Sequence, residues 1–392
     1  MRQAWPADGL VLAAGGGMGN NMAKLQVELK KVVDDSYEIE IGRGLFGSLA
    51  ADLKNGLCGA KIHKFAVVTD TTVEPLYGAP LAGALRREGF EVHLLSFPAG
   101  EKSKTRATKE QVEDAMLAAG LRRDCAVVAV GGGVVTDLAG FVAGTYGRGV
   151  PFVNYATTIL AAADASVGGK TAVDTPLATN LIGLFNQPKK VYLDLDTWKT
   201  LPAREIACGL AETIKHACMA DAAFFGWLEE HMEDILRLKG DACEYMAQKN
   251  CSIKYHVVMQ DERESGLREI LNLGHTVGRA VETVSDYRLL HGEAVAIGLM
   301  AEARLSCRMG YLTEEEAARM EALLARAGLP VRIPAYINRE ALIKKLYTDK
   351  KVRDGKLRFV VQNGIGAVVC FGENSYAVPV SEDMARSILE EL

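Results

Sequence analysis

The sequence lacks the features that mark several large classes of protein. It has no apolar run near the roughly 18 residues that a membrane-spanning helix needs. Its formal net charge of -5 gives no basis for a nucleic-acid partner. Its eight cysteines include no CxxC pair, and we expect no export signal, so the thiols should be reduced, in a cytoplasmic protein, and mostly part of the core. What remains is a globular enzyme-sized chain of 392 residues, enough for two domains.

The first residues carry little structural information. Residues 1–21 are expected to form a disordered extension, with Met22 as an alternative start. They contain a GGGMG tract, but no strand of useful length precedes it. This tract therefore does not predict a nucleotide site.

The rest of the chain divides by its pattern. Residues 22–201 alternate short β-rich runs with helical stretches, which predicts a mainly parallel sheet covered by helices. The predicted strands are 37–42, 64–70, 91–97, 125–130, 151–156 and 190–194, with helices at 74–88 and 104–119. Residues 202–392 are mainly helical, with a short strand pair near 358–370. Their predicted helices are 204–219, 222–238, 242–258, 274–284, 293–308 and 314–327. We predict a Rossmann-like α/β domain and an all-α domain, with the active site between them.

A glycine turn follows one of the apolar strands. Gly131-Gly132-Gly133 leads through Val134 into a predicted helix that contains Asp137. Such a turn can bring backbone N–H groups to a pyrophosphate. It does not have the GxGxxG spacing, so a purely structural tight turn is the alternative.

Three metal-ligand residue types lie in the helical part. Glu212, His275 and His291 would give one carboxylate and two imidazoles, which suit a divalent transition metal such as zinc with a fourth position for substrate. His216, four residues after Glu212, is a weaker metal candidate. For Glu212 and Lys215 the simpler interpretation is a surface ion pair on one helix face.

Longer motifs carry a resemblance to a known family. They are GGGVVTDLAGFVAGTYGRGV, ATTILAAADASVGGKTAVDTPL, LPAREIACGLAETIKH, DERESGLREILNLGHTVG and LLHGEAVAIGL. Together, from about Gln26 to the C-terminus, the chain resembles the 3-dehydroquinate synthase family of sugar-phosphate cyclases. The resemblance implies a two-domain fold like that of dehydroquinate synthase and glycerol dehydrogenase, bound NAD, one zinc or cobalt ion, and a homodimer.

The implied reaction belongs to the shikimate pathway. A 3-deoxy-D-arabino-heptulosonate 7-phosphate substrate is oxidised by NAD at C5, loses phosphate by β-elimination, is reduced again, and closes by an intramolecular aldol step to 3-dehydroquinate. NAD then acts with no net redox change.

The resemblance also implies roles for individual residues. Lys254 and Arg268 would hold the substrate carboxylate, Lys350 the phosphate, and Arg148 would reach the neighbouring subunit's site. The other substrate-site positions are Asp164, Lys170, Asn180, Lys215, Asn272 and Arg279. The NAD positions are Asp70, Gly100, Glu101, Lys104, Gly132, Gly133, Val134, Asp137, Thr157, Thr158, Lys170, Thr179, Thr197 and Thr200. The metal ligands are Glu212, His275 and His291.

Three positions depart from the family pattern. Thr136 stands where the turn usually has glycine, Thr179 where the loop has a lysine against NAD, and Arg279 where a histidine serves the phosphate site. The Thr179 change predicts weaker NAD binding than a lysine would give. For Arg279 we expect a fixed cation for phosphate, and the alternative is an outward side chain that pairs with Glu282.

Other functions stay open at this point. The nearest is another sugar-phosphate cyclase that makes a different carbocycle, although Lys254 and Arg268 favour a carboxylated substrate. A metal-dependent polyol dehydrogenase would be marked by net NADH release. A regulatory or assembly protein that kept the fold is disfavoured by the complete set of metal-ligand residues.

Overall fold

The computed structural model describes residue 29, residues 33–347 and residues 357–392. Residues 36–392 form one compact unit. The predicted extension at 1–21 and the proposed phosphate residue Lys350 lie outside the described residues. The domain boundary near residue 201 stays a prediction. Residues 36–201 are called the sheet half and residues 202–392 the helical half.

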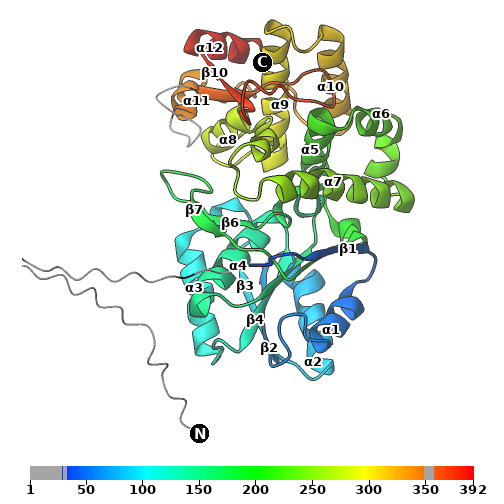
Figure 1. The fold of residues 1–392 in the computed structure, drawn as a ribbon, viewed down its shortest axis with the longest axis vertical. Helices are drawn as coiled ribbons and strands as arrows, with labels where there is room; N and C mark the ends of the chain where they lie inside the picture. Colours follow the sequence, from blue (N-terminus) through cyan, green and yellow to red (C-terminus); the bar gives the residue numbers. More distant parts are fainter. Residues whose placement is uncertain (1–28, 30–32, 348–356) are drawn as a thin grey trace, which may run out of the picture. The chain divides into compact units, whose positions relative to one another are not determined.

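The sheet half is built on six parallel strands in the order β1-β8-β5-β4-β2-β3 (Figure 1). They are β1 (Glu38–Gly42), β2 (Lys64–Asp70), β3 (Glu91–Phe97), β4 (Cys125–Gly131), β5 (Phe152–Ala156) and β8 (Lys190–Asp194). The helices beside them are α1 (Phe46–Lys54), α2 (Ala79–Arg87), α3 (Arg106–Ala118) and α4 (Gly133–Thr145). All six predicted strands are confirmed, whereas α1 was not predicted.

Two apolar cores cover opposite faces of this sheet. Successive side chains of a strand point to opposite faces, so Val128 packs with Leu49 and Leu85 of α1 and α2. Its neighbour Val127 packs with Leu138 of α4 on the other face. Every residue of β4 is buried, as expected for a central parallel strand covered on both sides. The same burial explains why the strand reads as a continuous apolar run.

The helical half contains eight described α-helices. They are α5 (Ala203–Ala220), α6 (Ala222–Leu236), α7 (Gly240–Gln260), α8 (His275–Val284), α9 (His291–Arg308), α10 (Glu314–Arg326), α11 (Arg339–Leu346) and α12 (Glu382–Glu391). The first six match the predicted helices within two residues at each end. Local signals fix some ends: Thr313 and Glu316 form a reciprocal capping box at the start of α10. The last two helices were not predicted.

Two small antiparallel pairs complete the fold. β6 (Lys170–Val173) pairs with β7 (Ile182–Phe185), and β9 (Leu357–Val360) pairs with β10 (Ala377–Val380). The predicted strand pair near 358–370 is therefore wrong in its second member, because the chain between β9 and β10 makes only a single bridge, Gln362 to Val368. The helical half is thus not purely α.

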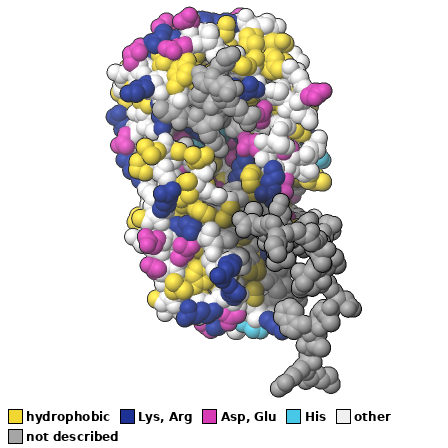
Figure 2. All heavy atoms as spheres, turned by 60° about the vertical axis from the view of Figure 1, so that its left-hand side comes forward, with side chains coloured by type: hydrophobic (Ala, Val, Ile, Leu, Met, Phe, Trp, Pro, Cys, Tyr) yellow, Lys and Arg dark blue, Asp and Glu magenta, His cyan; other side chains and the backbone are white. Residues whose placement is uncertain are grey.

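Helix hydropathy, cysteine burial and surface charge can be compared with what the composition predicts. No described helix is long and apolar enough to cross a membrane. All eight cysteines are free, six of them buried, which confirms the expected core role. On the face shown in Figure 2, Lys and Arg side chains are interspersed with Asp and Glu side chains.

Candidate active site

A cleft of about 1130 Å³ lies where the two halves meet. Asp70, Gly132 and Thr157 line it from the carboxyl ends of β2, β4 and β5, and His275 and His291 line it from α8 and α9. Ligands of open parallel sheets bind at this edge of the strands. The predicted position of the active site therefore coincides with a cleft.

The glycine turn joins β4 to α4 at the floor of the cleft. β4 ends at Gly131, and α4 starts at Gly133 with Gly132 as its N-cap residue. A Cβ at Gly131 would lie 2.5 Å from Val135 Cγ2, so the tight turn requires a residue without a side chain there. The departure at Thr136 causes no conflict, because its hydroxyl donates to Gly133 O at 3.1 Å within the helix. The free N–H groups of the first turn of α4 face a site that suits a pyrophosphate.

The three predicted metal ligands come together in the cleft wall. Glu212 Oε1 lies 3.5 Å from His275 Nε2 and 3.4 Å from His291 Nε2. One ligand atom from each residue lies within 4.8 Å of the other two. The group joins α5, α8 and α9, so it exists only in the folded chain.

Hydrogen bonds on the far side of each ring fix which nitrogen faces Glu212. His275 Nδ1 lies 3.1 Å from Leu273 O, and His291 Nδ1 lies 3.3 Å from Glu282 Oε2. Both partners are acceptors, so each Nδ1 carries a proton and Nε2 is the nitrogen that faces Glu212. Burial lowers the pKa of His291, but Glu282 and Glu212 raise it to about 10, so this ring binds a metal ion only after its Nε2 proton has left. Two Nε2 atoms beside a buried carboxylate are a donor set that suits a divalent metal ion.

Lys215 sets the charge of this group. It is buried, forms an ion pair with the fully buried Glu212, and donates to Leu271 O at 3.1 Å. The alternative of a surface ion pair is therefore wrong. Burial alone would raise the pKa of Glu212, but Lys215 lowers it below the usual range and keeps the carboxylate ionised. Burial and Lys215 lower the pKa of His275, which keeps that imidazole neutral and able to bind a metal.

A second group of metal-ligand atoms lies beside the first. Asp164, Glu212 and His216 also have one ligand atom each within 4.8 Å of one another. Here both carboxylates already pair with lysines, Asp164 with Lys254 and Glu212 with Lys215. The Lys254 ammonium, which pairs with no member of the first group, disfavours a second cation at that position.

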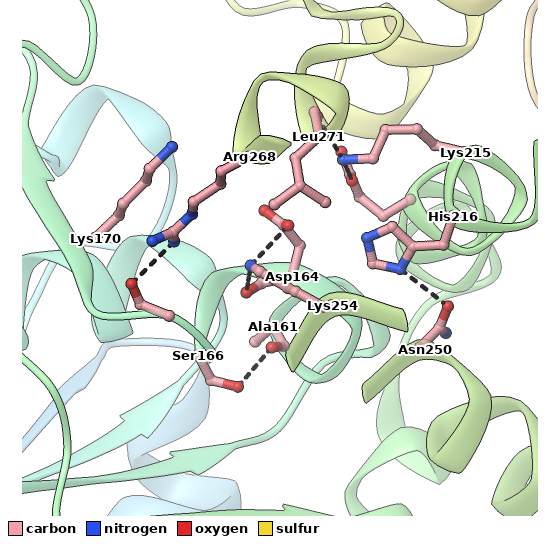
Figure 3. A network of polar contacts seen from close by, with 12 residues as sticks. Ala161, Asp164, Ser166, Lys170, Lys215, His216, Asn250, Lys254, Arg268 and Leu271 are labelled. Atoms are coloured by element: carbon pink, nitrogen blue, oxygen red, sulfur yellow. Dashed lines mark hydrogen bonds and ion pairs between the residues drawn. The ribbon is translucent and has the colours of Figure 1, made fainter. Parts of the chain in front are cut away.

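Polar side chains from both halves meet beside the metal candidates (Figure 3). Lys254 Nζ lies 2.7 Å from Asp164 Oδ1, and Lys170 Nζ lies 2.7 Å from Glu264 Oε2. Asn272 Nδ2 donates to the other oxygen of Glu264 at 2.8 Å. Glu264 was not predicted as a site residue. Its φ of 60° puts it in the left-handed region, where the chain turns its carboxylate into the cleft.

Arg279 faces the same cleft from α8. Its Nε and Nη1 are buried, and neither has a hydrogen-bond partner among the described residues. Glu282, the partner in the alternative interpretation, instead contacts His291. The side chain thus points inward, as the functional interpretation requires.

Lys104 organises the opposite side of the cleft. It is buried, forms an ion pair with Asp137, and donates to Asn180 Oδ1 at 2.6 Å. Burial and neighbouring carboxylates raise the pKa of Glu101 to about 7, against the effect of Lys104. Thr179 lines this region without adding a cation.

Most of the predicted site residues line the cleft. In addition to those described above, they are Gly100, Gly133, Val134, Thr158, Thr200 and Arg268. Thr197 lies beneath it, where its hydroxyl donates to Thr157 O at 3.1 Å. Glu212 and Lys215 are buried behind its wall. Arg148 is exposed and lies outside the cleft of its own chain.

These features define a class: enzymes that combine a dinucleotide site with a bound divalent metal to act at a carbon that carries a hydroxyl group. Residues 94–208 match the 3-dehydroquinate synthase N-terminal family model, and residues 209–352 match the C-terminal one. The 3-dehydroquinate synthase of Pelobacter propionicus is 47% identical over 338 residues, which cover 86% of this chain and 93% of that protein. The chain belongs to the 3-dehydroquinate synthase family.

Solved structures agree with the fold. The 2-epi-5-epi-valiolone synthase ValA of Streptomyces hygroscopicus, solved with NAD+ and Zn2+ bound, is 30% identical with a TM-score of 0.82, covering 94% of this chain and 99% of that one. A probable glycerol dehydrogenase of Sinorhizobium meliloti is 16% identical with a TM-score of 0.60, and the match covers 90% of this chain and 95% of that one. The second match concerns the fold alone, and it confirms the predicted relation to glycerol dehydrogenase-like folds.

Proposed function

We propose that this cleft converts 3-deoxy-D-arabino-heptulosonate 7-phosphate into 3-dehydroquinate and phosphate, with NAD and one zinc or cobalt ion. The observation that carries the proposal is that His275 and His291 line the same cleft as the glycine turn of α4, with Glu212 buried beside them. The ion would act as a Lewis acid on the substrate hydroxyl, and NAD would take up and return one hydride.

Glu212, His275 and His291 would hold the metal, and Lys215 keeps that site ordered by binding both Glu212 and a backbone carbonyl. The N–H groups at the start of α4 would bind the pyrophosphate of NAD. Thr157 and Thr158, at the end of β5, lie within the same cofactor part of the cleft.

Two arginines support an anionic substrate. Arg279 offers buried N–H groups that have no partner among the described residues, which suits the phosphate. Arg268, together with Lys254, would bind the carboxylate. This carboxylate site favours dehydroquinate synthesis over the making of a carbocycle that lacks a carboxylate.

Paired acids and bases in the cleft can hold or move protons. Asp164 is ionised, since Lys254 and Lys215 lower its pKa more than burial raises it. Lys254 and Lys170 each touch a carboxylate, so a proton can pass between neighbours as charge shifts on the substrate. With arginine at position 279, that residue holds the phosphate as a fixed cation, and the leaving phosphate itself would accept the proton released on elimination.

Arg148 supports a homodimer. Its φ of 71° lies between two glycines that also have positive φ, Gly147 and Gly149, so the chain presents this side chain in a strained, exposed turn. A second copy of the chain could receive it in its cleft. A single monomeric species in sedimentation at assay concentrations would contradict this arrangement.

One assay tests the function. The purified protein, with NAD, Zn2+ or Co2+ and the heptulosonate phosphate, should release one phosphate for each carbocycle formed without accumulation of NADH. A sustained rise of NADH absorbance in step with substrate loss would instead support a polyol dehydrogenase.

A further inference from the structure

A tyrosine outside the cleft wall is linked to the proposed carboxylate site. Tyr37, directly before β1, accepts a hydrogen bond from the N–H of Gly168 at 2.9 Å. The carbonyl of the same Gly168 accepts from Arg268 Nη2, also at 2.9 Å. Gly168 thus connects the phenol oxygen of Tyr37 to the guanidinium of Arg268 through the two peptide groups that flank its Cα.

Gly168 has a backbone conformation and a close contact with Arg268 that a residue with a side chain would not allow. Its φ is 92°, which favours glycine, and a Cβ there would lie 2.5 Å from Arg268 Nη2 and 2.9 Å from Val258 Cγ2. The residue therefore lets the guanidinium approach the backbone closely. The N–H of Gly168 donates to Tyr37, so this bond is one of the restraints on the backbone at Gly168.

Backbone carbonyls hold the guanidinium of Arg268, but they do not occupy all of its N–H groups. Nη1 donates to Glu262 O and Nη2 to Gly168 O, which uses two of its five N–H groups. Nε is buried and has no hydrogen-bond partner among the described residues. Arg268 is almost fully buried, so an incoming carboxylate would find donors whose direction is set by these two carbonyls.

We propose that Tyr37 is a positioning residue for substrate-carboxylate recognition: it holds the backbone N–H of Gly168, and the carbonyl of Gly168 in turn orients Arg268. This inference rests on the proposed function in that it takes Arg268 as the carboxylate-binding residue. Without the phenol oxygen, the Gly168 N–H loses its partner, so the backbone at Gly168 can shift and its carbonyl is no longer a fixed acceptor for Arg268. The effect should fall on binding of the carboxylate and not on the chemical steps at the metal.

The test compares Tyr37→Phe with Tyr192→Phe. Tyr192 is a control of the same residue type: its hydroxyl donates a hydrogen bond to Asp52 at 2.7 Å, whereas that of Tyr37 accepts one from backbone, and Tyr192 does not line the cleft. Tyr37→Phe should raise KM for the heptulosonate phosphate about tenfold, or about 1.4 kcal/mol, with kcat changed less than twofold. Tyr192→Phe should leave both constants unchanged.

Two further measurements separate positioning from a general loss of stability. In calorimetric titration, Tyr37→Phe should weaken 3-dehydroquinate about tenfold and the same ring without its carboxylate by less than twofold. Hydrogen–deuterium exchange of the peptide that contains Gly168 should become faster in Tyr37→Phe and not in Tyr192→Phe, and this result does not depend on any substrate.

The outcomes distinguish the two ideas. A wild-type protein that neither turns over the heptulosonate phosphate nor binds 3-dehydroquinate contradicts the proposed function. An active wild type with the same KM in Tyr37→Phe, or equal losses for both rings, overturns the role of Tyr37. Unchanged exchange at Gly168 in Tyr37→Phe overturns it as well, whatever the substrate proves to be.

Discussion

Replacement of Arg279 by alanine should separate ligand binding from fold stability. The side chain lies one helical turn after His275, lines the cleft, and holds Nε and Nη1 buried without hydrogen-bond partners among the described residues. A buried cation in this state costs the free protein desolvation energy and is ready for an anion. Alanine should therefore weaken phosphate binding without lowering the melting temperature.

The size of the effect follows from the two unpaired groups. A hydrogen bond to a charged group contributes about 1.5–3 kcal/mol. Loss of both contacts, at about 3 kcal/mol in total from the lower end of that range, corresponds to at least a roughly 100-fold weaker phosphate interaction. Arg279→His should keep much of the activity, because a histidine is partly charged near neutral pH.

The assay combines inhibition by inorganic phosphate, KM for the heptulosonate phosphate, and thermal unfolding. Arg319→Ala is the control, since Arg319 pairs with Glu229 on the surface of the helical half. For Arg279→Ala we expect a higher inhibition constant and KM with an unchanged or higher Tm. Unchanged phosphate inhibition and KM would refute the reasoning, and so would a fall in Tm that accounts for the loss of activity.

Two further predictions concern the metal and the pH dependence of stability. His275→Ala leaves two of three protein ligands, so elemental analysis should show loss of tight zinc or cobalt binding, and full occupancy at wild-type affinity would contradict the assignment. Burial alone would raise the pKa of Asp261, but three backbone N–H groups and the Ser265 hydroxyl lower it to about 2. A folded pKa below the unfolded value gives stability that is present above about pH 4 and lost as the pH falls through about 2. Asp261→Asn should thus cost about 2 kcal/mol near pH 7, less toward pH 2, and a pH-independent difference in urea unfolding would argue against it.

The strands of the sheet could be predicted where burial on both faces makes their sequence continuously apolar. Covered parallel strands such as β4 are continuous apolar runs, so they were found. β6 and β7 were missed because each has only four residues and lies near glycines. Gly183 in β7 shows why: a Cβ there would lie 2.0 Å from Thr171 O, so the close pairing of these strands requires a residue that usually indicates a loop.

The candidate site could be predicted only in part, because some of its residues are recognised only by contacts that form on folding. Residue type indicated Glu212, His275 and His291 as a metal group, and the family resemblance implied the same three residues. The roles of Glu264 and Glu282 depend on contacts made by folding, with Lys170 and with the outer nitrogen of His291. No spacing in the sequence signals either contact. The burial of Lys215 could not be inferred either, since an i, i+3 pair on a helix looks the same at the surface.

Among the described cleft residues, the lysines and the arginines differ in the partners that they bind. The lysines at 104, 170 and 254 each pair with a carboxylate, at Asp137, Glu264 and Asp164. Arg268 instead binds backbone carbonyls, and Arg279 pairs with no described carboxylate. A substrate carboxylate would share Lys254 with Asp164, whereas an anion could bind either arginine without displacing a described carboxylate. Permanent cations thus remain for the two anionic ends of the proposed substrate, whereas the lysines stay coupled to acids with which they can exchange protons.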